Sequence, residues 1–115
     1  MAQSTKIAVI GASGYSGAEL LRLLIMHPKV ELVAITSRQE AGRSLGEVFS
    51  RFRASRFENL AFINPDIDTI VDSGAEAVFL TLPHGVASEF AVPILERGLR
   101  VIDLSADFRL NDAEA

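Results

Sequence analysis

A short apolar run that passes directly into a glycine-rich turn constrains the fold more than any other feature. Lys6–Ile10 (KIAVI) is apolar after its lysine and rich in β-branched side chains, and Gly11 follows at once. A run without polar alternation is typical of a strand that is buried on both faces, as in a parallel sheet. The turn has the spacing GxxGxxG, completed by Gly14 and Gly17. The pattern therefore predicts a strand, a tight turn and a helix at the start of the chain.

The rest of the chain continues this alternation of apolar runs and amphipathic stretches. Pro28 should end a first helix over Gly14–His27, and Val30–Thr36 reads as a second strand. Ser37–Asn59 is the least regular part of the chain. The other expected elements are a short helix around Leu45–Phe52, a strand over Leu60–Asn64, a helix over Ile67–Ser73 capped by the Asp66 side chain, a strand over Ala77–Leu82, a helix over Val86–Arg97 that Pro93 kinks or breaks, and a strand over Leu99–Leu104.

This alternation predicts the fold class. Consecutive parallel strands need right-handed crossovers, which place helices on both faces of the sheet. Five strands in this rhythm predict an α/β, doubly wound, Rossmann-like fold with the strand order 3-2-1-4-5, and a flavodoxin-like order 2-1-3-4-5 is the alternative. The 115 residues show no internal repeat and no boundary, so they predict one domain over 1–115.

Composition excludes several kinds of site. The chain has no cysteine and only two histidines, so it holds no disulfide and no thiol nucleophile, and we expect no metal site. The net charge of −4 argues against nucleic acid as a partner. Arg51, Arg53 and Arg56 alternate with phenylalanines, which we expect to anchor this segment on the core while the arginines face water. Apolar runs fall short of the ~20 residues of a membrane span, so we expect a soluble, cytoplasmic protein with no membrane contact.

The glycine turn predicts a phosphate site. Glycine allows positive φ and lets the backbone approach a pyrophosphate, and the following helix start offers free N–H groups. The spacing departs from the GxGxxG of dinucleotide sites, so tight packing of strand against helix is the alternative explanation.

The end of the second strand indicates which dinucleotide binds. Sites for NAD usually have a carboxylate there, whereas this chain has Thr36, Ser37 and Arg38. A hydroxyl and a guanidinium suit a 2′-phosphate, so the sequence favours NADP as cofactor. Glu40 nearby weakens this inference, Arg43 is a second candidate, and a solvated Arg38 is the alternative.

Four segments together resemble one known family. They are GASGYSGAELLRLL, TSRQEAGRSLGEVF, LPHGVA and VIDLSADFRL. Their order and spacing resemble the N-terminal domain of the N-acetyl-γ-glutamyl-phosphate reductases, and the resemblance covers Lys6 to Asn111. The aspartate-semialdehyde dehydrogenases share this fold and chemistry, but they usually lack LPHG together with DLSADFRL. An NADP-binding domain of that second kind is therefore an alternative.

The resemblance implies an oxidoreductase of arginine biosynthesis that reduces a small-molecule acyl phosphate to an aldehyde with NADPH. In that family a cysteine thiolate displaces phosphate to form a thioester, and hydride transfer follows with a histidine of the next domain as acid and base. No catalytic residue is then expected in this chain, because it stops before both groups. The resemblance implies a cofactor domain that is inactive alone, from a parent enzyme that is a homo-oligomer, with the fragment itself monomeric.

The resemblance also assigns residues to parts of the site. The pyrophosphate turn matches Gly11, Ser13, Gly14, Tyr15, Ser16 and Gly17. The 2′-phosphate position matches Ser37 and Arg38, and the turn beside the nicotinamide matches Leu82, Pro83, His84 and Gly85. We expect His84 to shape this turn. Arg109 is expected to hold the substrate phosphate, with Ser105 as a further donor, because a guanidinium matches the oxygens of a phosphate. The alternative for Arg109 is an ion pair with Asp103, Asp107 or Asp112.

The residues alone are also compatible with two functions of other classes. A nucleotide-sensing module of the same fold needs no catalytic group. A flavodoxin-like domain that binds FMN or phosphate would have acidic residues after the first strand, where this chain has glycines.

Overall fold

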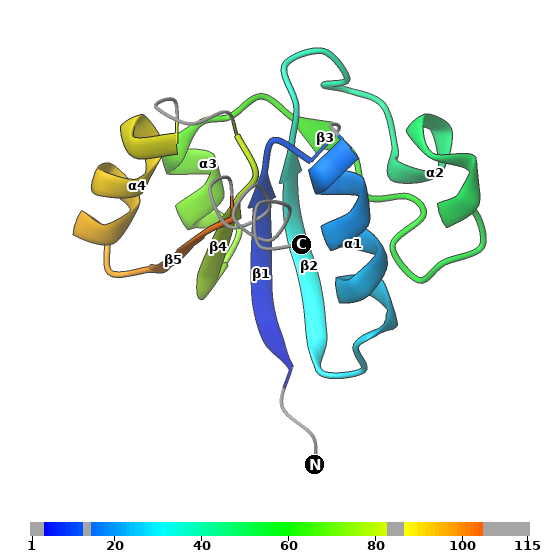
Figure 1. The fold of residues 1–115 in the computed structure, drawn as a ribbon, viewed down its shortest axis with the longest axis horizontal. Helices are drawn as coiled ribbons and strands as arrows, with labels where there is room; N and C mark the ends of the chain where they lie inside the picture. The colour runs from blue at the N-terminus through cyan, green and yellow to red at the C-terminus, as the bar shows by residue number, and fades with distance from the viewer. Residues whose placement is uncertain (1–3, 13–14, 83–86, 105–115) are drawn as a thin grey trace, which may run out of the picture.

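The computed structural model describes residues 4–12, 15–82 and 87–104. Within these residues, five strands form one sheet in the order β3-β2-β1-β4-β5, and every pair of neighbours is parallel (Figure 1). This order confirms the predicted Rossmann-like topology over the flavodoxin-like one. The elements are β1 Thr5–Ile10, α1 Tyr15–Met26, β2 Val30–Thr36, α2 Leu45–Val48, the 3-10 helix η1 Ser50–Phe52, β3 Phe62–Ile63, α3 Ile67–Asp72, β4 Ala77–Leu80, α4 Ala87–Glu96 and β5 Arg100–Asp103.

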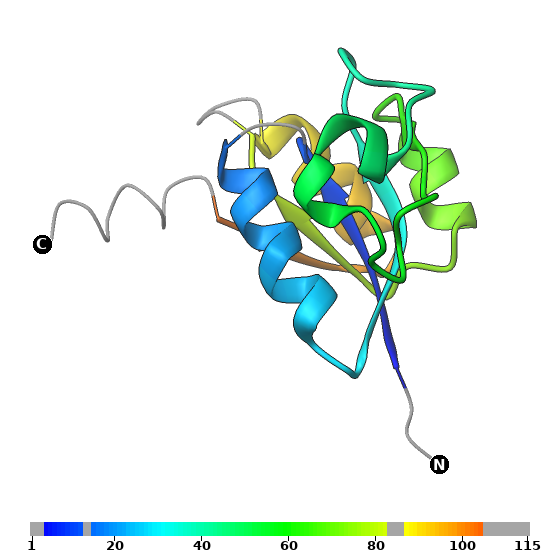
Figure 2. The same ribbon diagram turned by 90° about the vertical axis from the view of Figure 1, so that its right-hand side faces the viewer.

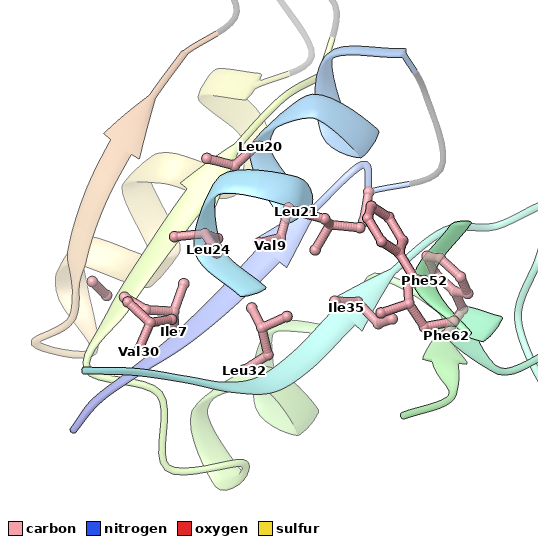
Figure 3. Close-up of a cluster of buried hydrophobic side chains, with 13 residues drawn as sticks. Ile7, Val9, Leu20, Leu21, Leu24, Val30, Leu32, Ile35, Phe52 and Phe62 are labelled. Atoms are coloured by element: carbon pink, nitrogen blue, oxygen red, sulfur yellow. The ribbon is translucent and has the colours of Figure 1, made fainter. Parts of the chain in front are cut away.

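The apolar run of β1 lies at the centre of the sheet and is buried on both faces. Its odd-numbered side chains Ile7 and Val9 pack in one cluster, which includes three leucines of α1 (Figure 3). Its even-numbered side chains Ala8 and Ile10 pack in a second cluster, which includes Ile70 of α3. Figure 2 shows α1 and α3 on opposite sides of the sheet. The absence of polar alternation in β1 follows from this cover on both faces.

The irregular segment between β2 and β3 is anchored as its phenylalanines predict. Phe52 is buried in the cluster beneath α1, and Phe49 and Phe57 pack partly against it. Arg56 is exposed, but it has a structural role that its position in the sequence did not indicate. Its Nη2 donates to the main-chain oxygens of His27 at 2.7 Å and Val30 at 2.8 Å. Arg56 therefore ties this segment to the turn that follows α1.

Several expected boundaries were wrong. The strand expected over 60–64 has only the two residues of β3, and the strand expected over 77–82 ends at Leu80. Helix α4 continues through Pro93, so the expected break is absent from the described residues of that helix. The carbonyl that Pro93 cannot bond belongs to the exposed Glu89, where water can satisfy it.

Asp66 stands at the expected N-cap position of α3, but its side chain has another partner. Its Oδ2 accepts a hydrogen bond from the hydroxyl of Thr69 at 2.6 Å, and the backbone N–H groups of Asp68 and Thr69 interact with the carboxylate only weakly, without the geometry of a cap. This hydroxyl is the main reason that the pKa of Asp66 lies below its ordinary value. A threonine three residues on therefore competed with the helix backbone for the carboxylate.

Helix α2 begins with a capping box. Its sequence pattern S-x-x-E is present at Ser44 and Glu47, but the sequence analysis did not predict it. The Glu47 backbone N–H donates to Ser44 Oγ at 3.3 Å, and the Ser44 N–H donates to Glu47 Oε1 at 2.8 Å. The bond from the Ser44 backbone is the first cause of a lowered pKa at Glu47, and the bond with its side chain is the second.

A pH-dependent contribution of Glu47 to stability follows. A carboxylate with a lowered folded-state pKa stabilises the fold above its unfolded pKa, and this contribution is lost as the pH falls through the folded-state pKa. We expect Glu47→Gln to destabilise the protein slightly at pH 7 and not at a pH below that folded-state pKa. Urea unfolding at both pH values measures this, with Glu31→Gln as the control for loss of one charge. An equal loss at both pH values would contradict it.

Candidate functional site

The predicted binding residues come from the carboxyl ends of adjacent strands. Because β2, β1 and β4 run parallel and side by side, Thr36, Ile10 and Leu80 end them at the same edge of the sheet (Figure 1). From β1 the chain crosses to β2 and β3 on one side, and β4 and β5 lie on the other. This edge is the switch point at which open α/β sheets bind ligands.

Gly11 makes the tight turn that leaves β1. Its φ is +86°, and a Cβ on this residue would lie 2.8 Å from Leu82 Cδ2. Its N–H donates to Thr36 Oγ1 at 3.2 Å, and its carbonyl accepts from Thr81 Oγ1 at 2.9 Å. The neighbouring strands therefore hold Gly11 from both sides. This arrangement fits the first glycine of a dinucleotide turn, whose function is the tight turn itself.

Gly17 makes a close approach between α1 and the residue after the turn. A Cβ there would lie 2.6–2.7 Å from the backbone atoms of Ala12, which is itself fully buried. This matches the third glycine of a dinucleotide turn, which allows close packing of helix on strand. Ser13 and Gly14 lie outside the described residues. Tyr15 and Ser16 are the first two residues of α1, so the N-terminus of this helix follows the turn directly.

The three residues at the end of β2, which the sequence analysis considered together, differ in burial and in hydrogen-bond partners. Thr36 is fully buried, and its hydroxyl accepts from Gly11, so it is committed to the fold. Ser37 is also buried, and its Oγ accepts from the Glu40 N–H at 3.2 Å. Arg38 is exposed, and within the described part of the chain it makes no ion pair. Arg38 is therefore the cation at this strand end that is available to an anion.

The loop after β2 is fixed by β3 near both of its ends. The N–H of Ser37 donates to Ile63 O at 3.0 Å, the N–H of Gly42 to Phe62 O at 2.8 Å, and the N–H of Phe62 to Arg43 O at 2.8 Å. We call residues 37–43 the β2 loop. Its one acidic residue is Glu40, whose Oε1 accepts from Arg43 Nη1 at 3.0 Å. The Glu40 carboxylate thus pairs with Arg43 rather than with Arg38.

The other predicted residues are only partly described. Leu82, after β4, is half-buried and packs against the cluster on the α3 side of the sheet. Pro83, His84 and Gly85 lie outside the described residues, as do Ser105 and Arg109. Their assignments remain predictions.

Sequence reasoning missed the two threonines that shape the turn. Thr81 was part of an expected strand, but it follows β4, and its hydroxyl and N–H bond the backbone of Ile10 and Gly11. Thr36 was expected only as the last residue of the second strand, but its hydroxyl supports Gly11. The available signal was that both threonines stand at the carboxyl end of a strand adjacent to the glycine turn, Thr36 as its last residue and Thr81 directly after it.

The described part of the chain has neither a metal-ligating cluster nor a membrane-spanning helix. Within residues 4–12, 15–82 and 87–104, no group of three or more histidine, cysteine, aspartate or glutamate side chains could hold a metal ion. No helix in this part of the chain is long and apolar enough to cross a membrane.

A family model described as "Semialdehyde dehydrogenase, NAD binding domain" matches residues 6–114. A curated N-acetyl-γ-glutamyl-phosphate reductase of Akkermansia muciniphila is 53% identical over 112 residues, which are 97% of this chain and 32% of that protein. A [LysW]-L-2-aminoadipate/[LysW]-L-glutamate phosphate reductase of Saccharolobus solfataricus is 47% identical over 114 residues, 99% of this chain and 32% of that protein. The chain thus spans about a third of the length of these relatives.

Solved structures share the fold. Aspartate semialdehyde dehydrogenase of Candida albicans, crystallised with NADP, has a TM-score of 0.71 at 24% identity, over 93% of this chain and 31% of that chain. A protein named RSP, crystallised with β-NAD⁺ and operator DNA, has a TM-score of 0.56 at 15% identity, over 97% of this chain and 59% of that chain. Proteins of different function therefore share this architecture, and the fold alone does not select among them.

Proposed function

Because the chain belongs to the family of semialdehyde dehydrogenase NAD-binding domains, we propose that it is the NADP-binding part of an N-acetyl-γ-glutamyl-phosphate reductase. The name of the reductase comes from curated relatives such as the Akkermansia muciniphila protein, at 53% identity over 97% of the chain. An aspartate-semialdehyde dehydrogenase-like enzyme is less well supported, because the structural likeness to one comes with only 24% identity.

The residues at the end of β2 are the basis for proposing NADP rather than NAD as the cofactor. An Asp or Glu placed there would bond a ribose 2′-hydroxyl and repel a 2′-phosphate. Arg38 stands at this position, exposed, and the carboxylate of Glu40 is engaged by Arg43. A guanidinium makes strong charge-assisted hydrogen bonds to phosphate oxygens. This arrangement supports NADP over NAD.

The remaining assignments follow the chain around the same edge of the sheet. In the proposal the pyrophosphate lies at the turn from Gly11 to Gly17, where the N-terminus of α1 offers N–H groups. The nicotinamide half lies toward the turn after β4, which holds Leu82, Pro83, His84 and Gly85. Ser105 and Arg109, which follow β5, hold the phosphate of the acyl phosphate substrate.

The chemistry divides between this chain and the rest of the protein. NADPH supplies a hydride to the acyl carbon when it is bound. The chain has no cysteine, so the proposal places the thiol nucleophile in the two thirds of the relatives' length that this chain does not span. The residues of this chain bind and orient the cofactor, and they bring its reactive end to the carboxyl edge of the sheet.

Loss of the Arg38 guanidinium tests the proposal. We expect Arg38→Ala to weaken NADPH binding by roughly 10- to 100-fold and to leave NADH binding nearly unchanged, because only NADPH carries the 2′-phosphate. Calorimetric titration of the purified protein with each cofactor measures both effects. Arg97→Ala is the matched control, since Arg97 is also an exposed arginine but follows α4 and lies just before β5 begins.

Two results would contradict the proposal. Equal binding of NADPH and NADH by the unaltered protein would remove the basis for choosing NADP. A similar loss of both cofactors in Arg38→Ala would show that Arg38 supports the fold or the shared half of the dinucleotide.

A further inference from the structure

The β2 loop, which begins at the proposed 2′-phosphate site, holds a second arginine. Arg43 lies five residues after Arg38, and its guanidinium is engaged by Glu40 at 3.0 Å. Consecutive turns keep the loop short: the Glu40 N–H donates to Ser37 Oγ, and the Arg43 N–H donates to Glu40 O at 3.0 Å. The loop therefore carries two guanidiniums and one carboxylate within six residues.

The ion pair between Arg43 and Glu40 is exposed, so Arg43 can readily exchange Glu40 for another anion. The Arg43 side chain is 54% exposed and that of Glu40 is 26% exposed. Ion pairs at such exposed positions contribute little to stability, because water and salt screen them and the side chains lose entropy. A phosphate monoester carries nearly two negative charges, so it competes well with one carboxylate for a guanidinium.

The backbone of the loop does not need to move for this exchange. Hydrogen bonds from Gly42 to Phe62 and from Phe62 to Arg43 fix the main chain on both sides of the arginine. Only the Arg43 side chain has to leave Glu40. The fixed main chain keeps the backbone of Arg43 beside Phe62 of β3 in either state.

We infer that Glu40 competes with the cofactor's 2′-phosphate for Arg43 and thereby limits the affinity of the site for NADPH. This inference rests on the proposed function, since it concerns the same phosphate. Glu40 is then a specificity-determining residue that makes no contact with the cofactor. Its pairing with Arg43 withholds a second guanidinium from the phosphate.

Removing the charge of Glu40 while keeping its shape tests the inference. We expect Glu40→Gln to bind NADPH about three- to tenfold more tightly and NADH unchanged, because Arg43 is released toward the phosphate. The backbone N–H that bonds Ser37 stays in this variant. Glu31→Gln is the matched control, since it removes one exposed carboxylate near the amino end of β2. Calorimetric titration of the unaltered protein and of both variants with NADPH and with NADH gives the six dissociation constants.

A double-mutant cycle with Arg43→Ala decides whether the effect passes through Arg43. We expect the gain from Glu40→Gln to disappear when Arg43 is alanine. A gain that persists there would overturn the inference, because Glu40 would then act on the phosphate directly. An NADPH affinity of Glu40→Gln equal to that of Glu31→Gln would overturn it as well.

The same measurements separate this inference from the proposed function. If Arg38→Ala loses the preference for NADPH while Glu40→Gln changes nothing, the 2′-phosphate site stands and only the role of Glu40 fails. If neither variant changes the preference, the 2′-phosphate site itself is wrong.

Discussion

Replacing Phe62 by alanine should lower the free energy of unfolding by about 3–5 kcal/mol. Phe62 is 1% exposed and is one of the two residues of β3. Its ring contacts that of Phe49 edge-to-face with 6.4 Å between centroids, and it packs in the cluster that includes the leucines of α1. Removal of the ring leaves a cavity at the place where the irregular segment meets the sheet.

The second expected effect of Phe62→Ala is on cofactor binding. The main chain of Phe62 makes two of the hydrogen bonds that fix the β2 loop, so loosening of β3 should also weaken NADPH binding. Urea unfolding and cofactor titration measure the two effects. Phe62→Leu, which keeps most of the apolar volume, should lose clearly less of both. If Phe62→Ala is nearly as stable as the unaltered protein, β3 does not anchor the irregular segment between β2 and β3 on the sheet.

Replacing Gly17 by alanine should lower the free energy of unfolding by about 2–3 kcal/mol and the melting temperature by roughly 8–15 °C. The added methyl group would lie 2.6–2.7 Å from the main chain of Ala12. Main-chain atoms between a strand and a helix cannot move aside alone, so α1 must shift away from β1. Because the N-terminus of α1 is the proposed pyrophosphate site, affinities for NADPH and NADH should fall together.

Gly46→Ala is the matched control for Gly17→Ala. Gly46 also lies in a helix, and a Cβ there would meet Glu58 Cγ at 2.8 Å. Glu58 has a flexible side chain that can turn away, and alanine favours a helix by about 1 kcal/mol over glycine. We therefore expect Gly46→Ala to be near neutral. Thermal unfolding of both variants compares the two clashes, and an equal loss in both would contradict the backbone argument.

The sheet was predictable because its signals are strong and local. The β-branched run of β1 and its glycine turn predicted the start of the unit, and alternation with helices predicted a parallel sheet. It favoured the observed order β3-β2-β1-β4-β5 over the flavodoxin-like alternative. The weaker predictions concern short elements. The extent of β3 depends on pairing with Ile35 and Thr36 of β2, which lie far away in sequence. Local pattern carries no information on such pairing.

The candidate site was predictable in its main-chain framework and less so in its side chains. The glycine spacing indicated Gly11 and Gly17, whose crowding against Leu82 and Ala12 explains the residue type. The sequence could not show that Thr36 is buried against Gly11 while Arg38 is exposed, because the alternation of a strand stops where β2 ends, at Thr36. The Glu40–Arg43 pair likewise depends on turns that only the folded loop defines.

The two threonines beside Gly11 also bear on how strongly the edge of the sheet can bind a ligand. Because Thr36 and Thr81 bond Gly11 through its N–H and its carbonyl, the exit from β1 has a set conformation in the protein alone. A binding loop that is ordered beforehand loses less conformational entropy when its ligand arrives. The two threonine hydroxyls that bond Gly11 therefore favour nucleotide binding through preorganisation.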